Sequence, residues 1–147
     1  MLAGVLDTDA TRAKEAAAQY GCPAFDSLEA LTSSSDAAVI ATPTITHSVI
    51  GCELLSKGID VLIEKPLAQS PEEGRALIEA AKSNARILQV GHLERFNPVV
   101  MALAEVVTTP LFFEIHRMSE FSPRSLDVDV VLDLMIHDID VVLSLVG

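Results

Sequence analysis

The chain has 147 residues, the size of one ordinary domain or of parts of two, and half of them are hydrophobic, so a substantial core is possible. Its formal charge of -11, from 21 acidic and 10 basic residues, repels phosphodiester backbones and argues against nucleic acid as a partner. The charge does not exclude a small nucleotide, because local backbone N–H groups can bind its phosphates.

No segment of the sequence is typical of a membrane span or a secretion signal. The longest apolar run, Val99 to Ala104, is much shorter than the ~20 residues that cross a bilayer. The start of the sequence lacks a basic region ahead of an apolar segment. Cys22 and Cys52 have no close spacing and are interpreted as free thiols. We therefore expect no membrane span and a cytoplasmic protein.

Strands and helices are predicted to alternate through the first ninety or so residues. In chain order they are a strand over 2–6, a helix over 10–20 capped by Thr8 or Asp9 and closed by Gly21, a brief helix around 28–31, a strand over 37–43, a helix over 46–57 stopped by Gly58, a strand over 60–66, a helix from Pro71 to about Lys82 behind a capping box at Ser70, and a strand over 86–91. The strands are continuous apolar runs, which is typical of a buried parallel sheet. The sequence therefore predicts an α/β fold with a doubly wound parallel sheet.

Unusual residues follow the predicted strands, at the edge where such sheets bind ligands. They are Asp7, Thr42-Pro43, Glu64-Lys65-Pro66 and Gly91-His92. Beyond this point the pattern changes: a helix begins after Asn97-Pro98, residues 111–120 alternate like a long strand, and a very apolar helix begins at about Val130. We expect residues 1–91 to form one domain, and residues 92–147 to begin a second.

The sequence contains no glycine-rich phosphate turn of the G-x-G-x-x-G type. The chain begins instead on what is interpreted as the second strand, with Asp7 where the ribose-binding acid would lie. In the usual strand order the first strand lies in the middle of the sheet. The prediction is an incomplete Rossmann-type sheet, with the first strand and its turn absent and both ends of the chain truncated.

Glu64-Lys65-Pro66 ends an apolar strand on two opposite charges. An exposed ion pair at the start of a loop would explain them without any function and would be worth ~0–1 kcal/mol. A functional explanation is that the strand directs its last side chains into a ligand crevice, with Pro66 restricting the backbone and able to hold a cis bond. Position alone leaves both explanations open.

The segment "DLMIHDID" carries Asp133, His137 and Asp140 within a ~60° arc of one helix face. The helix is apolar nearly all round, so we expect it to be buried. A carboxylate one turn away can orient His137 and raise its pKa toward neutrality. A core histidine satisfied by Asp133 is the alternative without chemistry. A divalent metal bound by the three side chains is a second alternative, which the lack of another histidine at ligand spacing makes less favourable.

Three further side chains are candidates for ligand contacts. His47 lies one turn into the helix that follows Thr42-Pro43, where a packed histidine is the alternative. Arg95, beside Phe96, is either a solvated arginine or an anion clamp. Arg124 lies in a polar loop just before the helix of His137, where it could meet an anionic group of a substrate.

Four motifs in order carry a family resemblance: A-T-P with a histidine four residues after the proline, E-K-P, V-G-x-x-x-R-F-N-P, and D-x3-H-x2-D. Together they resemble the glucose–fructose oxidoreductase and inositol dehydrogenase (Gfo/Idh/MocA) family from Asp7 to Asp140. Within the family, "GHLERFNP" and "PRSLDVDVVLDLMIHDID" are most similar to the bacterial UDP-N-acetylglucosamine 3-dehydrogenases. The resemblance implies a nicotinamide-dependent oxidoreductase that acts on a CH–OH group of a sugar or sugar nucleotide. It also implies that residues 1–91 form a partial NAD-binding Rossmann domain and residues 92–147 the beginning of a substrate and dimerisation domain.

The resemblance also implies roles for single residues. Lys65, Asp133 and His137 match the catalytic positions. The implied cofactor contacts are Asp7, Thr42, Pro43, His47, Glu64 and Lys65. Arg95, Arg124 and Asp140 are expected to bind substrate. The Asp7 carboxylate would repel a 2′-phosphate, which favours NAD over NADP.

For the reaction we expect His137 as general base and Lys65 as a donor to the same hydroxyl oxygen. We expect a homo-oligomer in the intact protein, and we expect the 147 residues alone to bind NAD poorly and not to turn over. The alternatives are a metal-dependent hydrolase or lyase that uses Asp133, His137 and Asp140, and a non-catalytic module that pairs its apolar sheet surface with another chain.

Overall fold

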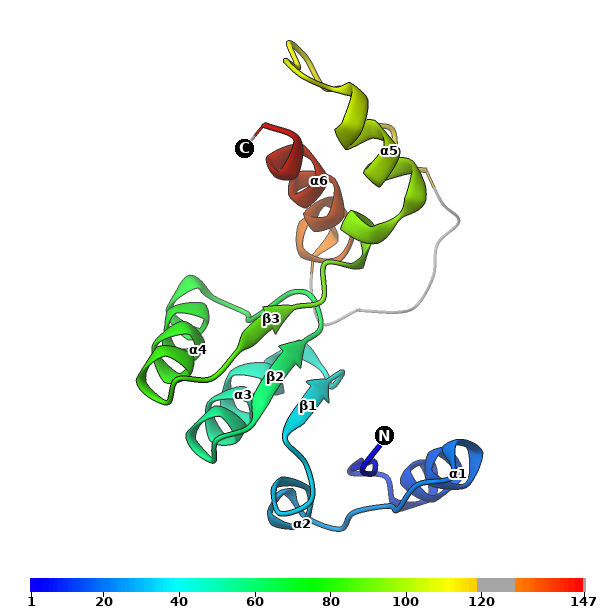
Figure 1. Ribbon diagram of the computed structural model, residues 1–147, viewed down its shortest axis with the longest axis vertical. Helices are drawn as coiled ribbons and strands as arrows, with labels where there is room; N and C mark the ends of the chain where they lie inside the picture. Colours follow the sequence, from blue (N-terminus) through cyan, green and yellow to red (C-terminus); the bar gives the residue numbers. More distant parts are fainter. Residues whose placement is uncertain (119–128, 147) are drawn as a thin grey trace.

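The computed structural model describes residues 1–118 and 129–146 (Figure 1). Its helices are α1 (Ala10–Tyr20), α2 (Leu28–Thr32), α3 (His47–Ser56), α4 (Pro71–Ser83), α5 (Pro98–Val106) and α6 (Ile136–Val146). Its strands are β1 (Ala37–Ile40), β2 (Asp60–Ile63) and β3 (Leu88–Val90). Two 3₁₀ turns, η1 (Thr44–Thr46) and η2 (Leu93–Phe96), precede α3 and α5, and a π-helical turn η3 (Val131–Met135) leads into α6.

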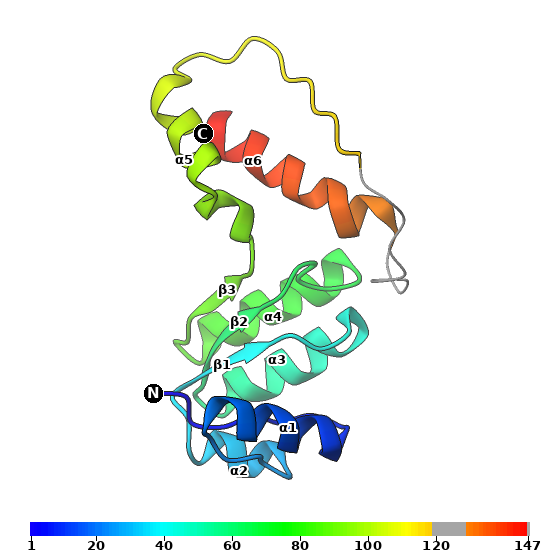
Figure 2. The same cartoon turned by 90° about the vertical axis from the view of Figure 1, so that its right-hand side faces the viewer.

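The three strands form one parallel sheet in the order β1-β2-β3. Helices α3 and α4 lie side by side on one face of this sheet (Figure 2). The core lies between these layers and consists of Ile40, Leu54, Leu55, Ile59, Val61, Ile63, Leu77 and Ala81. This arrangement confirms the predicted α/β class and the Rossmann-type parallel sheet.

Helix α3 approaches the sheet closely at Gly51. A Cβ atom at that position would lie 2.5 Å from Cδ2 of Leu77 and 2.9 Å from Cδ1 of Ile63. The missing side chain therefore lets α3, α4 and β2 meet in the core. Such close packing fixes the direction in which β2 ends, and β2 carries Glu64 and Lys65 at its carboxyl end.

Local signals in the sequence place the helix ends correctly. The carboxylate of Asp9 accepts the N–H groups of Thr11 and Arg12 at the start of α1, and Gly21 ends it at a φ of 65°. The Ser70 hydroxyl accepts the N–H of Glu73 at the start of α4. The Glu73 carboxylate returns to the N–H of Gln69 rather than to that of Ser70, so the capping box is displaced by one residue.

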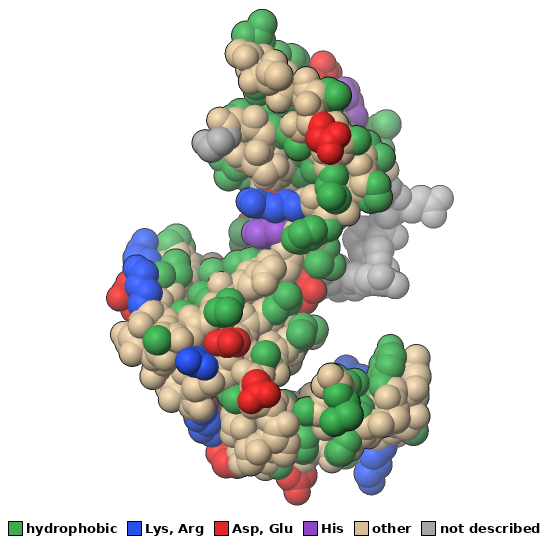
Figure 3. All heavy atoms as spheres, viewed as in Figure 1, with side chains coloured by type: hydrophobic (Ala, Val, Ile, Leu, Met, Phe, Trp, Pro, Cys, Tyr) green, Lys and Arg blue, Asp and Glu red, His purple; other side chains and the backbone are tan. Residues whose placement is uncertain are grey.

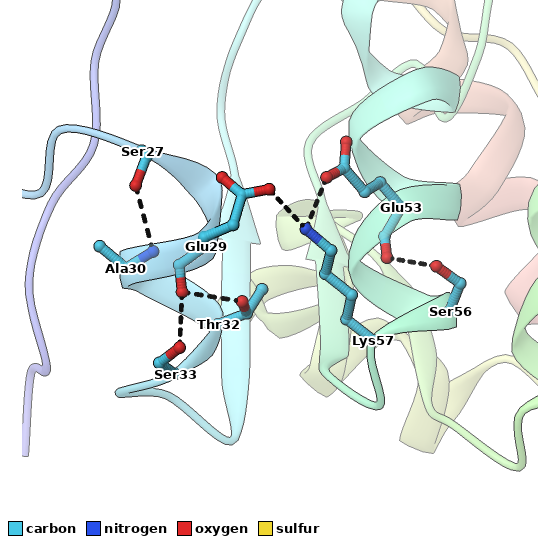
Figure 4. Close-up of polar contacts among 8 residues, drawn as sticks. All are labelled: Ser27, Glu29, Ala30, Thr32, Ser33, Glu53, Ser56 and Lys57. Atoms are coloured by element: carbon cyan, nitrogen blue, oxygen red, sulfur yellow. Dashed lines mark hydrogen bonds and ion pairs between the residues drawn. The ribbon is translucent and has the colours of Figure 1, made fainter.

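Lys57 fastens α2 to α3. Its Nζ donates to Glu29 Oε1 at 3.1 Å and to Glu53 Oε1 at 2.7 Å, as Figure 4 shows. All three side chains are at the surface, so this network joins two helices but contributes little to the free energy of unfolding.

The expected strand over residues 2–6 is wrong. Within the described residues this segment forms a single parallel bridge, between Val5 and Ala24, and does not join the sheet. A strand needs a continuous neighbour for its backbone hydrogen bonds, and in the part of the chain that the structure describes β1 is an edge strand. Figure 3 shows the surface hollowed between the sheet and the part that carries α1.

The second face of the sheet is open within the described residues, although a parallel sheet is usually covered on both sides. Val39 of β1 is 69% exposed, and Ile87 beside β3 is 64% exposed. A shallow depression of about 220 Å³ on this face is lined by residues of all three strands and their flanks.

Two expectations for the last third of the chain are also wrong. Residues 111–118 form no strand, and 119–120 lie outside the described residues; alternation alone cannot create the neighbouring strand that pairing requires. The final helix is present, but it is not buried. Met135 and Leu143 are 51% and 59% exposed. Among the described elements, α6 contacts mainly η2 and its own preceding turn η3. Among the described residues no helix combines the length and hydrophobicity needed to cross a membrane.

Candidate active site

Lys65 projects from the carboxyl end of β2 toward η3. The N–H of Glu64 donates to Ile40 O at 2.9 Å, which holds this strand end against β1. The Lys65–Pro66 peptide bond is cis. The ammonium of Lys65 donates to the main-chain oxygen of Asp133 at 2.7 Å and to its Oδ1 at 2.8 Å. The lysine side chain is 19% exposed, so a mostly shielded ion pair connects the sheet to the helical part of the chain.

Gly91 leaves the space that the Glu64 carboxylate occupies. Its N–H donates to Ile63 O at 2.8 Å, at the end of the β2–β3 pairing. A Cβ on Gly91 would lie 3.1 Å from Oε2 of Glu64. The Glu64 carboxylate is therefore packed against the end of β3, and the predicted cofactor residue lies on the ligand-binding edge of the sheet.

His47 is buried, with 1% exposure, and joins two of the turns on this edge. Its Nδ1 lies 2.9 Å from Pro66 O, and its Nε2 lies 2.9 Å from Thr42 O. Both ring nitrogens thus contact carbonyl groups of the chain itself. The geometry supports the packed histidine of the alternative explanation, because both nitrogens of His47 are already engaged. Thr42 itself stays exposed, and its hydroxyl contacts that of Thr46 at 2.7 Å.

Asp133, His137 and Asp140, which were predicted to lie on one helix face, do not act on a common partner. Asp133 lies within the π-helical turn η3 and His137 in α6, so the regular α-helical arc predicted for them does not apply. Asp133 contacts Lys65, whereas Asp140 is buried and accepts Arg95 through two hydrogen bonds, Nε to Oδ2 at 2.7 Å and Nη2 to Oδ1 at 2.5 Å. His137 lies on the helix between these two ion pairs.

The expected orientation of His137 by Asp133 is wrong. Within the described residues no hydrogen bond joins the two side chains, and Nδ1 of His137 is buried without a hydrogen-bond partner there. The pKa of His137 is lowered, first by burial, then by the positive charges of Lys65 and Arg117. The ring is therefore neutral near pH 7 and able to accept a proton. The raised pKa that the sequence suggested for His137 is wrong.

Arg95 and Asp140, both expected to bind substrate, contact each other. The arginine holds the pKa of the Asp140 carboxyl below its usual value. A bidentate pair of this kind is well ordered and joins η2 to α6. Asp138, on the same helix, is paired in a similar way with Arg117, which lowers the pKa of Asp138.

His92 and Arg117 belong to this region but were not among the predicted site residues. His92 follows Gly91 at the end of β3, and its buried Nδ1 lies 3.9 Å from Oδ1 of Asp140. Its place at a strand end was visible in the sequence. The role of Arg117 was not, because its partner Asp138 is 21 residues away and no local pattern links them.

The remaining predicted residues are elsewhere. Asp7 lies just before α1, where its Oδ1 accepts the N–H of Asp9 at 2.8 Å and its Oδ2 is 3.5 Å from Nε of Arg12. Arg124 lies outside the described residues. In the part of the chain that the structure describes, no three His, Cys, Asp or Glu side chains are placed to hold a metal ion, so Asp133, His137 and Asp140 do not form the metal site of the alternative hypothesis.

Comparison with known proteins decides the family. Residues 1–92 match the model of GFO_IDH_MocA, described as "Oxidoreductase family, NAD-binding Rossmann fold". The chain belongs to this family. The GFO_IDH_MocA assignment agrees with the motifs at the ends of β1, β2 and β3, and with the parallel sheet that brings them to one edge.

Similar GFO_IDH_MocA proteins are dehydrogenases. The chain is 44% identical over 147 residues to UDP-N-acetylglucosamine 3-dehydrogenase of Acidithiobacillus ferrooxidans, covering 99% of this chain and 47% of that protein. A solved structure of that dehydrogenase, GnnA, superposes with a TM-score of 0.92 at 43% identity over 98% of this chain and 48% of the other. GenD2 from gentamicin A biosynthesis, in complex with NAD, gives a TM-score of 0.71 at 27% identity over 74% of this chain and 32% of the other. The chain thus spans about half the length of the relatives it matches.

Proposed function

We propose that residues 1–147 form the catalytic part of an NAD-dependent dehydrogenase that oxidises a hydroxyl of a sugar nucleotide, with the 3-hydroxyl of UDP-N-acetylglucosamine as the first candidate. The observation that carries the proposal is the meeting of Lys65 from β2 with the η3–α6 segment beside His137, whose pKa is sensitive to the Lys65 charge. The 44% identity to the Acidithiobacillus enzyme supports the choice of substrate.

The residues present fit the nicotinamide end of the cofactor. Glu64 and Lys65 lie at the ligand-binding edge, and Thr42 is exposed beside them at the end of the neighbouring strand. Bound NAD would supply the hydride acceptor. No G-x-G-x-x-G turn occurs in the 147 residues, so contacts to the pyrophosphate would come from outside them.

In the proposed reaction the substrate hydroxyl loses its proton as the hydride departs from the adjacent carbon. His137, neutral near pH 7, accepts that proton. Lys65 donates a hydrogen bond to the same oxygen and stabilises its developing negative charge. Asp133 positions the lysine ammonium through the 2.8 Å contact and keeps the basic side chain from folding away from the edge.

Several finer points belong to the same proposal. Asp7 would bind the adenosine ribose, and its charge favours NAD over NADP. Arg95, Arg124 and Asp140 would lie near the substrate, with Asp140 acting through Arg95. The proposal also includes a division into residues 1–91 and 92–147, a cytoplasmic location and assembly into a homo-oligomer. The exposed apolar face of the sheet supports association with further polypeptide.

A hybrid enzyme tests the function. Residues 1–147 would replace the matching part of the Acidithiobacillus relative, and NADH formation with UDP-N-acetylglucosamine would be followed by absorbance. We expect turnover by the hybrid and a loss of at least about 100-fold in Lys65→Met and in His137→Asn, because each removes a group that acts on the reacting oxygen. Lys57→Met is the matched control, since that lysine also donates two hydrogen bonds, but to two surface carboxylates away from the site.

Two results would overturn the proposal: a folded hybrid that binds NAD without oxidising any sugar nucleotide, or near-normal turnover in both variants. The open sheet face supports one rival, a non-catalytic module that pairs with another chain. Light scattering on the 147-residue chain, together with the activity of the hybrid, separates the two. The rival predicts stable association of the chain and an inactive hybrid. The dehydrogenase proposal predicts an active hybrid, whether or not the chain associates.

A further inference from the structure

Helix α6, which carries His137, has one fully buried residue in the described part of the chain, and that residue is charged. It is Asp140, with an exposure of 6%. The apolar side chains of the helix remain half-buried or exposed. A buried carboxylate costs free energy unless basic groups pair with it. The place of α6 therefore depends on the partner of Asp140 more than on apolar packing.

The partner of Asp140 is Arg95 of η2, which donates Nε to Oδ2 at 2.7 Å and Nη2 to Oδ1 at 2.5 Å. The turn η2 is in turn fixed to the end of the sheet. The N–H of Gly91 donates to Ile63 O at 2.8 Å, and the N–H of Leu93 donates to Gly91 O at 3.0 Å. Two parallel hydrogen bonds between arginine and carboxylate restrict direction as well as distance. The ion pair therefore fixes α6 relative to the carboxyl end of β3.

A second ion pair holds the chain on the other side of His137. Lys65, at the end of β2, contacts Asp133, which lies four residues before the histidine, whereas Asp140 lies three residues after it. Figure 1 shows the beginning of α6 beside the ends of these strands. His137 and Asp140 are three residues apart in a regular α-helix, so they lie on one face of it. His137 thus lies between two attachments, one to the end of β2 and one to the end of β3.

We propose that Arg95 and Asp140 are positioning residues: their ion pair holds α6, and with it His137, at the edge of the sheet that carries Lys65. The pair then acts on the reaction through His137 and not by contact with the substrate. Proton transfer is sensitive to such positioning, because a displacement of about 1 Å can lower the rate on the order of 100-fold. The catalytic consequence rests on the proposed function, whereas the attachment of α6 does not.

Hydrogen exchange in the purified 147-residue chain tests the attachment. Arg95→Lys keeps the positive charge but loses the two-pronged contact, so the amides of residues 136–146 should exchange at least about 10-fold faster. Asp138→Asn is the matched control on the same helix. Asp138 accepts a similar pair of hydrogen bonds from Arg117, but residues 111–118 form no helix or strand that could fix α6 to the sheet. This control should change the exchange rates less than about 2-fold.

Unchanged exchange in Arg95→Lys would overturn the proposal, and so would equal acceleration in Arg95→Lys and Asp138→Asn. Arg95 is a half-exposed side chain, so its conservative replacement should leave the chain folded, which circular dichroism checks. If the hybrid is inactive while Arg95→Lys accelerates exchange in α6, the attachment stands and only the dehydrogenase proposal fails.

Kinetics of the active hybrid test the consequence for His137. Asp140→Asn should lower kcat by about 10- to 100-fold and leave the KM for UDP-N-acetylglucosamine within about 2-fold. Asp140→Glu, which can still accept both hydrogen bonds, should recover part of the loss. Adding Arg95→Lys to Asp140→Asn should lower kcat little further, because the two residues act as one unit.

The pH profile separates a displaced base from a smaller folded fraction. With His137 in place, kcat/KM rises with pH as the ring loses its proton, and Asp140→Asn should weaken this rise. A lower rate with an unchanged profile would mean only that less enzyme is folded, and would overturn the proposal. A KM raised about 10-fold with kcat preserved would also overturn it, because the pair would then bind substrate.

Discussion

The ammonium of Lys65 lies 2.8 Å from Oδ1 of Asp133, 68 residues away in sequence. A second hydrogen bond, to the main-chain oxygen of Asp133, makes this lysine a tether between the sheet and the last helix. The same contact brings the lysine proposed to stabilise the reacting oxygen to the segment that carries the proposed base, so stability and chemistry depend on one side chain.

Replacing Lys65 by methionine should therefore loosen the last helix. Loss of two charge-assisted hydrogen bonds should lower the free energy of unfolding by about 1–3 kcal/mol and speed hydrogen exchange over residues 131–146. Lys57→Met removes a lysine with two carboxylate partners at the surface and should cost less than about 1 kcal/mol, with no change in exchange over those residues. Equal effects of the two substitutions would show that the Lys65 contact is not a tether.

Two helical glycines should respond in opposite ways to alanine. Gly51→Ala places a Cβ 2.5 Å from Leu77 Cδ2 and 2.9 Å from Ile63 Cδ1, so we expect a loss of about 1–3 kcal/mol by overpacking. Gly74→Ala, in α4, meets only Leu67 Cδ2 at 3.9 Å and should gain about 0.5–1 kcal/mol. Urea unfolding of both variants measures the difference, and a stabilising Gly51→Ala would contradict the described packing of α3.

His47→Phe should destabilise the chain strongly. The substitution keeps a buried ring but removes the ring nitrogens that lie 2.9 Å from Thr42 O and Pro66 O, at a cost of about 1–3 kcal/mol. His116→Phe is the matched change at an exposed site and should have little effect. If NAD binding by the hybrid were lost while thermal unfolding of His47→Phe stayed normal, His47 would be a direct cofactor contact rather than a structural link between two turns.

Stability should fall as the pH is lowered from about 7 to 5. The folded chain holds the pKa of His137 below its ordinary value of 6.5, whereas the unfolded chain protonates this ring near that value. The unfolded state therefore binds more protons in this window, and acid favours it. The carboxyls of Asp138 and Asp140 have lowered pKa values, so their contributions are lost only at lower pH.

Urea midpoints measured at several pH values test this dependence, with His137→Gln as the comparison. The variant should show a shallower decline than the unmutated chain between pH 7 and 5, because it lacks the titrating ring. A parallel decline in both would assign the effect to other groups. A steeper decline in the variant would mean that folding raises the pKa of His137.

Local signals in the sequence were sufficient for most of the fold up to residue 91. The ends of α1 follow from Asp9 and Gly21, and the start of α4 follows from Ser70, because capping depends on groups within a few residues. The apolar runs of β1, β2 and β3 were correctly interpreted as parallel strands. The position of Glu64, Lys65 and Thr42 on the ligand-binding edge then follows, since the carboxyl ends of the strands in such a sheet share one edge.

The strands predicted over residues 2–6 and 111–120 failed for a shared reason. Alternating or apolar residues show that a segment can enter a sheet, but a strand exists only where a second strand accepts its hydrogen bonds. The buried state predicted for the last helix failed similarly, since burial depends on what packs against it. The cofactor contact expected of His47 stays a prediction, and the structure adds that both of its ring nitrogens lie 2.9 Å from carbonyl oxygens of the chain itself.

The sequence by itself determined the helix caps, the parallel strands and the residues that stand at their ends, because each depends on neighbours a few positions away. Only the tertiary structure decided that Lys65 meets Asp133, that Arg95 meets Asp140 across 45 residues, and that burial and the charge of Lys65 lower the pKa of His137. Pairings over such separations, and the pKa values that follow from them, depend on burial and distance. Those are set by packing and are not written in any local pattern.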